Sequence, residues 1–213
     1  MLPFYKISVN EDDETGIDFN AWVDYPAHMK NFVAFGKQSV RLAYSVDKAE
    51  RKVTGVMISA NTPIYRNDPH EHYVFFTPEV IEVIRRKFIK NGFMQNLNSQ
   101  HEQNDVINGV ILVDSFIINN SNPNYPNTPE AFSKMNLQDG TWIGTYFVED
   151  DKVWEDVLAG KWGGFSVEGW FDLMPASIKK KFSKQTKTNN MKKKSIFAML
   201  FGKETFAEAT TAD

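Results

Sequence analysis

The sequence predicts an α+β domain, built on a curved, mostly antiparallel β-sheet or barrel with flanking helices. Most segments between turn signals are rich in β-branched and aromatic residues, as strands are. Only one long and one short segment show helical spacing, and no internal repeat is present. The 213 residues, 42% of them hydrophobic, suffice for one sizeable core without disulfides or metals.

The first half of the chain contains the clearest helix. Residues 39–59 predict two strands around a polar turn, whereas residues 17–35 mix strand-like alternation with a proline break. The segment TPEVIEVIRRKFIKNG (77–92) predicts a helix with Thr77 as its cap, apolar residues at helical spacing and Gly92 at its end.

The second half predicts further strands and one short helix. A loop rich in Asn and Pro interrupts them after residue 118. The strand candidates are 93–101, 106–118, 141–148 and 165–173, and the helix candidate is 151–161.

Composition excludes several classes of chemistry. The chain has no cysteine, so disulfides, thiol catalysis and cysteine-bound metals are excluded. It has no apolar run near the ~18 residues that span a bilayer, and its amino terminus lacks the pattern of a signal peptide. We therefore expect a soluble, cytoplasmic protein.

The distribution of charge divides the chain in two. Residues 176–213 hold 9 Lys and 3 acidic residues, a balance of +6, whereas residues 1–175 have a balance of −9. We expect a folded domain at 1–175, then a basic linker at 177–195 and an amphipathic tail at 195–209. The tail is either a docking helix or a frayed terminus. Its charge alone is a weak signal for nucleic acid, so a solvated linker is the preferred interpretation.

The segment KWGGFSVEGW (161–170) raises the question of a nucleophile. Its glycine pair allows a close approach of backbone or substrate. A serine inside an apolar strand pattern needs a hydrogen-bond partner or a cleft. Ser166 is therefore either a solvated residue of an edge strand or a nucleophile.

Without cysteine, nucleophilic catalysis would use Ser or Thr with a histidine base. His101 lies among polar residues at the end of a strand candidate, where a base is open to a cleft. Asp114, a carboxylate within an apolar strand, is a candidate third member that would hold the imidazole. Glu168 is the alternative. It shares a strand face with Ser166, but we expect it to lie too near the serine to reach the far side of His101.

A metal site is an alternative to the serine–histidine pair. His70 and His72 point the same way if they lie on a strand, and His101 or Glu102 would complete a ligand set. The surrounding RNDPHEHY reads as a polar turn, however, and no HExxH helix accompanies it. We therefore expect neither a metal nor a cofactor.

Several separate segments, taken in order, resemble the XkdF-like serine proteases of tailed phages, which are relatives of the prohead maturation proteases. The resemblance runs from about residue 16 to residue 173. Its segments are AWVDYPAHMKNFVAF (21–35), VTGVMISANTPIYRND (53–68), YVFFTPEVIEVIRRKF (73–88), NLNSQHE (96–102), VDSFII (113–118) and GTWIGTYFVEDDKVWEDVLAGKWGGFSVEGWF (140–171).

The resemblance implies a fold like that of herpesvirus assemblin, with His101 as general base and Ser166 as nucleophile. The family's SF strand begins with an acidic residue, which is Asp114 here. That match supports Asp114 as the third member, and Glu168 stays the alternative. The expected oxyanion donors are the backbone amides of Gly163, Gly164 and Phe165.

The resemblance also implies a serine endopeptidase that matures the phage capsid. Such an enzyme works inside the immature prohead in the host cytoplasm, where it cuts scaffold and capsid-protein extensions. We expect it to cut its own 176–213 tail as well, and to form a homodimer. We expect no membrane and no specific nucleic-acid partner. The alternative is a non-catalytic capsid-assembly protein that kept the protease fold.

Overall fold

The structure, a computed structural model, describes residues 2–24, 44–67, 69–102 and 104–176. Its helices are α2 (Pro78–Lys90) and α3 (Asp151–Leu158), with 3₁₀ turns η1 (Phe93–Gln95) and η2 (Glu130–Met135). Its strands are β1 (Phe4–Ser8), β2 (Gly16–Val23), β3 (Tyr44–Asp47), β4 (Lys52–Ile58), β5 (Ile64–Arg66), β6 (His72–Phe75), β7 (Leu97–Ser99), β8 (Val110–Ile117), β9 (Trp142–Val148), β10 (Gly164–Trp170) and β11 (Asp172–Pro175).

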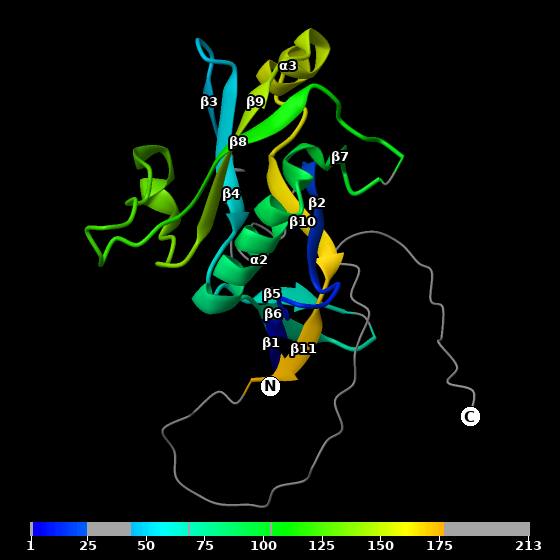
Figure 1. Cartoon of the computed structure of the whole chain (residues 1–213), viewed down its shortest axis with the longest axis vertical. Coiled ribbons are helices and arrows are strands. Elements are labelled where there is room, and N and C mark those ends of the chain that lie inside the picture. The colour runs from blue at the N-terminus through cyan, green and yellow to red at the C-terminus, as the bar shows by residue number, and fades with distance from the viewer. Residues whose placement is uncertain (1, 25–43, 68, 103, 177–213) are drawn as a thin grey trace, which may run out of the picture.

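These strands form three sheets around the central helix α2 (Figure 1). The sheets have the strand orders β11-β1-β6-β5, β10-β2-β7 and β3-β4-β9-β8. Pairing is antiparallel except in β1–β6 and β2–β7, which are parallel. The predicted α+β class is confirmed. The barrel alternative is wrong for the described strands, because they divide into three open sheets instead of closing one.

Helix α2 confirms the prediction for residues 77–92. Thr77 caps it, since its hydroxyl accepts a hydrogen bond from the N–H of Val80 at 3.4 Å. One face of the helix is apolar and enters the core, where Ile81, Ile84 and Phe88 are fully buried. Each of these side chains contributes about 2 kcal/mol through burial. The helix is therefore the body against which the sheets pack.

An aromatic cluster joins the sheet that contains β2 to the sheet that contains β9. The ring of Trp22 lies 5.8 Å from that of Tyr146, 5.1 Å from that of Trp162 and 5.9 Å from that of Phe165, measured between centroids. Asn20 donates a hydrogen bond to the Tyr146 hydroxyl at 2.6 Å. Burial raises the pKa of Tyr146, so this phenol stays neutral. The cluster fixes β2 and β10 rigidly against β9.

Several predicted elements shift or divide. The strand candidate at 93–101 forms η1 and then the short β7, and the candidate at 106–118 begins only at Val110. Strands β1, β5 and β6 were not predicted, because three to five residues are too few to establish a period. The predicted linker at 177–195 and tail at 195–209 lie outside the described residues.

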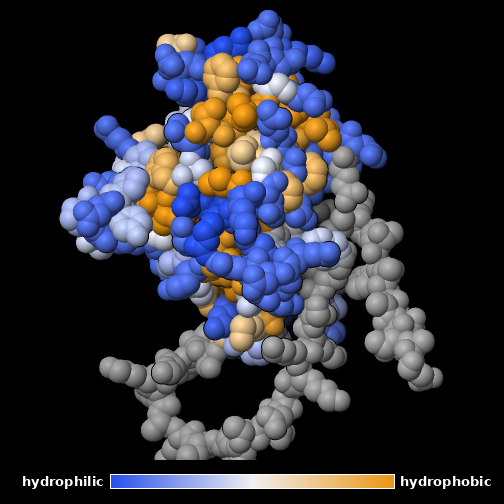
Figure 2. Space-filling model, in the orientation of Figure 1, coloured by the Kyte–Doolittle hydropathy of each residue, from blue (hydrophilic) through white to orange (hydrophobic). Residues whose placement is uncertain are grey.

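The surface of the described domain carries both hydrophobic and hydrophilic residues. Figure 2 shows hydrophobic residues among hydrophilic ones, with most of the former in the upper half of this face. Exposed apolar side chains include Val106, Val113 and Leu158. None of the described helices is long and apolar enough to cross a membrane.

Two glycines allow β10 to lie close against β2. A Cβ atom at Gly163 would stand 2.1 Å from the carbonyl oxygen of Asp24, and one at Gly169 would stand 1.8 Å from that of Gly16. No side chain fits at either distance. The glycine pair of the sequence thus allows a close approach, but at Gly163 the partner is the protein's own backbone.

We predict that Gly169→Ala lowers the free energy of unfolding by about 3 kcal/mol, because its methyl group must displace the backbone of β2. Gly92→Ala is the control. Gly92 has a φ of 76° but no atom within 4 Å of the added Cβ, so this change costs about 1 kcal/mol through backbone strain alone. Urea denaturation of both variants measures the difference. Equal losses would show that the close contact is not needed.

Candidate active site

The candidate site lies on the sheet with the order β10-β2-β7. Ser166 on β10 is directly opposite Ala21 on β2, and Ala21 is opposite Asn98 on β7. Strands lie about 4.8 Å apart, so the Cα atoms of Ser166 and Asn98 are about 10 Å apart. The side chain of Ala21 is only a methyl group. Longer side chains can therefore meet above it.

His101 lies in a strained turn directly after β7, next to the residues Ser166, Ala21 and Asn98 that lie side by side on the sheet. The N–H of Glu102 donates to the carbonyl of Ser99 at 2.9 Å, which closes a four-residue turn after β7. Its two central residues, Gln100 and His101, have φ angles of 55° and 63°. Positive φ at both positions is the pattern of a type I′ turn, which favours Gly and Asn. Left-handed backbone costs other residues about 1 kcal/mol or more each.

The neighbouring strands hold this turn in place. The N–H of Gln100 donates to the carbonyl of Trp22 at 2.9 Å, and the indole of Trp162 donates to the Ser99 hydroxyl at 3.1 Å. Backbone strain at residues other than Gly persists where surrounding contacts fix it, and it concentrates at functional sites. The turn is therefore a fixed support for the imidazole.

A β-bulge adjoins Glu168. Glu168 is opposite Phe19, but Gly169 is opposite Ile17, so Asp18 of β2 is an extra residue without a partner on β10. Bulges bend a strand and re-aim its side chains, and they are common beside active sites. Along β10, Ser166 and Glu168 lie on the same face because they are two residues apart.

The carboxylate of Glu168 binds two side chains from β7 and its turn. His101 Nδ1 lies 2.9 Å from Glu168 Oε1, and Asn98 Nδ2 donates to the same oxygen at 2.6 Å. The side chains of His101 and Glu168 are 7% and 17% exposed. Burial on this scale strengthens the interaction between them.

The Glu168 contact fixes the tautomer of His101. A carboxylate only accepts hydrogen bonds, so Nδ1 carries the proton. In the neutral ring, Nε2 is then the basic nitrogen. This is the arrangement that a general base needs when a carboxylate orients it.

Ser166 lies on the same sheet face as Glu168 and is 4% exposed. Since His101 bonds Glu168, its imidazole also lies over this face. The Ser166 hydroxyl makes no hydrogen bond with the described residues. Catalytic hydrogen bonds often tighten only when substrate is present, so the geometry is compatible with a serine–histidine pair.

The structure places Asp114 elsewhere. This residue lies on β8 of the third sheet, opposite Thr145, and is exposed to solvent. Its carboxylate needs no partner in the protein, because water solvates the charge. The expectation that Glu168 lies too near Ser166 to reach His101 is wrong. Of the two candidates for the third member, Glu168 is the one that bonds the histidine.

The three amides predicted as oxyanion donors differ in whether they already pair with β2. The N–H of Asn20 and the C=O of Trp22 form hydrogen bonds with β7 and its turn. The backbone N–H and C=O groups of the alternate residues Ala21 and Val23 therefore point toward β10. The amide of Gly163 already donates to Val23 O at 2.8 Å, and Gly164 is opposite the same residue. These two amides therefore pair with β2. The N–H of Phe165 points away from β2. Its role as an oxyanion donor stays a prediction.

The histidines proposed for a metal site do not come together. His72 lies on β6 in another sheet from β7, where its Nδ1 is 2.6 Å from the carbonyl of His70. Its ring also packs edge-on against Tyr5. No group of three His, Cys, Asp or Glu side chains with metal-ligand geometry occurs within residues 2–24, 44–67, 69–102 and 104–176.

Sequence reasoning missed Asn98. It is 1% exposed, and its donation to Glu168 gives it a direct part in the site. The available signal was a polar residue inside the strand candidate, three positions before His101. An Asn in such a place needs a specific partner.

We predict that the neutral imidazole of His101 carries its proton on Nδ1, and that Glu168→Gln shifts it toward the Nε2–H form. The reason is that an amide can present either a donor or an acceptor, so the carboxylate's control of the ring is lost. Long-range ¹⁵N–¹H spectra of the imidazole measure the tautomer. Asp114→Asn is the matched control and should leave the spectrum unchanged. An Nε2–H ring in the unmodified protein would contradict the described contact.

A family model with the description "Putative phage serine protease XkdF" matches residues 39–174. The match includes His101, Ser166 and Glu168 and begins after the segment at 21–35, so the resemblance is confirmed over a shorter range than predicted. No curated protein and no solved structure matches the chain. The match spans more than half of the chain, and the chain therefore belongs to the XkdF family of phage serine proteases.

Proposed function

We propose that the protein is a serine endopeptidase in which Ser166 is the nucleophile, His101 the general base and Glu168 the residue that orients the base. One observation supports this assignment above all: the hydrogen bond of 2.9 Å between His101 Nδ1 and Glu168 Oε1, on the face that also carries Ser166. Family membership supports the reaction class.

The proposed reaction follows from these positions. Ser166 Oγ attacks the scissile carbonyl carbon, and its proton passes to His101 Nε2. Glu168 stabilises the imidazolium ion that forms. The imidazolium then gives its proton to the departing amine, which leaves an acyl-enzyme. A water molecule hydrolyses this ester with His101 again as base.

Asn98 is a positioning residue in this proposal. It shares Oε1 of Glu168 with His101, and its amide donates a bond that holds the carboxylate in one place. A buried carboxylate needs such donors to offset the loss of hydration. Asn98 therefore acts through Glu168 and not on the substrate.

The proposed substrates are the scaffold and capsid-protein extensions of an assembling phage head, together with the enzyme's own 176–213 segment. The supporting facts are the phage family and the +6 charge of that segment against −9 in residues 1–175. We place the reaction inside the immature prohead in the host cytoplasm. We also include a homodimer in the proposal, following the resemblance to assemblin.

We predict that intact-mass measurements show cleavage products when the protein is produced with the capsid and scaffold proteins of its own phage, and that Ser166→Ala abolishes them. Glu168→Gln should slow cleavage by about 10²–10⁴-fold, because it removes the charge and the tautomer control. Asp114→Asn should cleave as fast as the unmodified protein.

Two results would contradict parts of this proposal. Equal masses in the unmodified protein and in Ser166→Ala would favour a non-catalytic role in capsid assembly. Loss of cleavage in Asp114→Asn, with none in Glu168→Gln, would return the third position to Asp114.

A further inference from the structure

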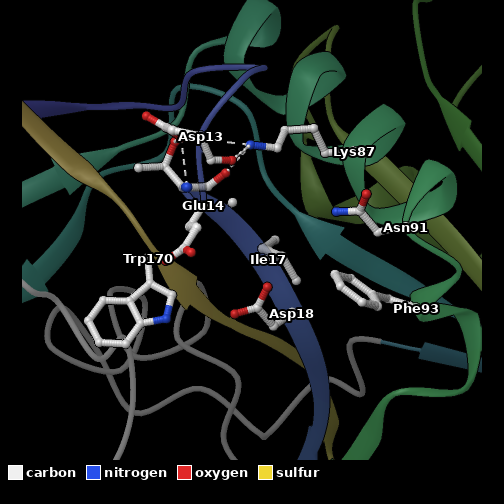
Figure 3. Close-up of a pocket in the computed structure, with 10 residues that line it drawn as sticks. Asp13, Glu14, Ile17, Asp18, Lys87, Asn91, Phe93 and Trp170 are labelled. Atoms are coloured by element: carbon white, nitrogen blue, oxygen red, sulfur yellow. Dashed lines mark hydrogen bonds and ion pairs between the residues drawn. The ribbon is translucent and has the colours of Figure 1, made fainter.

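A hollow of about 330 Å³ lies at the far end of the strand pair that carries the site (Figure 3). Glu14 and Asp18 from β2 and the loop before it form one part of its wall. Phe93 from η1, Lys87 from α2 and Trp170 from β10 form the rest. We call it the acidic hollow.

The acidic hollow lies along the same strand face as the proposed nucleophile. Ser166, Glu168 and Trp170 alternate along β10, and the bulge lies on β2, so these three side chains share one face. Four residues of a strand span about 13 Å. An extended peptide bound at Ser166 would thus bring a side chain about four positions away to Trp170.

Among the described residues that line the hollow, Lys87 carries the one ammonium group, and this group is already engaged. Lys87 Nζ donates to the carbonyls of Asn10, Asp13 and Thr15 at 2.6, 2.8 and 2.5 Å. These bonds use all three of its protons. Figure 3 shows Lys87 turned toward this loop, with its nitrogen pointing at Asp13.

Two carboxylates that line the hollow have no partner within the described part of the chain. Neither Glu14 nor Asp18 makes a side-chain hydrogen bond or ion pair with the described residues. Burial raises the pKa of Asp18, Lys87 lowers it and Glu14 raises it further. With Asp13 beside Lys87, the described residues that line the hollow include three carboxylates and one ammonium group, a formal charge of −2.

Two aromatic side chains, Trp170 and Phe93, line the hollow together with the carboxylates. The Trp170 side chain is 37% exposed, and Phe93 is half-buried. An indole face attracts cations, and the aliphatic stem of a long basic side chain packs on apolar surface while its charge meets carboxylates. Such a wall suits an extended cationic side chain better than a metal ion.

We propose that the acidic hollow binds a lysine or arginine side chain of the polypeptide substrate, about four residues from the bond that is cut. The inference rests on the proposed endopeptidase function. The chain's own 176–213 segment, with 9 Lys, and other basic polypeptides offer the same side chain.

The first test measures binding without cleavage. Full-length Ser166→Ala protein, labelled with ¹⁵N, is titrated with N-acetyl-lysinamide and with N-acetyl-norleucinamide, which has a similar stem but no charge. The resonance of the Trp170 indole N–H, assigned with Trp170→Phe, is followed. We expect a saturable shift with the lysine probe and none with the norleucine probe.

Variants show whether the carboxylates cause this binding. Glu14→Gln and Asp18→Asn should each weaken it about fivefold, the upper range for a partly exposed ion pair. Asp114→Asn, which changes an exposed carboxylate on another sheet, should leave it unchanged. The proposal is overturned if the lysine probe does not shift the Trp170 resonance. It is also overturned if the shift is as large in the Glu14→Gln/Asp18→Asn double variant as in the protein with both carboxylates.

A second test separates this proposal from the proposed function. The unmodified protein is incubated with a random peptide library, and the cut sites are mapped by mass spectrometry. Enrichment of Lys or Arg at one fixed distance from the cut bond supports the hollow as a substrate-binding subsite. Cleavage without such enrichment shows that the hollow is not a subsite. If the lysine probe binds but no peptide is cut, the hollow stands and the endopeptidase assignment fails. Cut sites in the chain itself and in co-produced capsid protein show which source supplies the basic residue.

Discussion

The close pairing of β10 with β2 is the constraint on which the site depends. Gly163 and Gly169 allow the two backbones to approach at both ends of the pair, where any side chain would collide with a carbonyl. Between them, the register sets Ser166 opposite Ala21 and Glu168 opposite Phe19. A shift by one residue would turn Ser166 and Glu168 to the opposite face, into the aromatic cluster around Trp22. The glycines thus fix which side of the sheet carries the chemistry.

Burial explains why Glu168, and not Asp114, serves the histidine. An exposed carboxylate such as Asp114 is well solvated, so water weakens its attraction for any cation. Glu168 is 17% exposed and takes hydrogen bonds from Asn98 and His101. Its charge is offset by the protein's own donors, and in this setting the bond to His101 both orients the ring and stabilises its positive form.

The sequence predicted the long elements well because their periods extend over many residues. Helix α2 shows its cap and four buried positions directly, and β9 is rich in aromatic and β-branched residues along its whole length. His101 and Ser166 were found from residue type and from the resemblance. Glu168 was only the alternative third member and Asn98 was missed, because these two residues meet across a third strand and no local pattern reports a contact between residues 70 positions apart. The bulge at Asp18 depends likewise on the pairing of two strands and is invisible in either one alone.

The order in which the site's strands occur along the chain has a consequence for synthesis. Strand β2 begins at Gly16, whereas β10 ends at Trp170, so the sheet that holds the site closes only when nearly all of the 1–175 region exists. At about 5–20 residues per second, a ribosome needs several seconds or more to reach that point. A nascent chain therefore has no Ser166, and no Glu168 to bond His101, while its earlier segments emerge. Translation itself therefore keeps the proposed protease inactive until its domain is complete and able to fold.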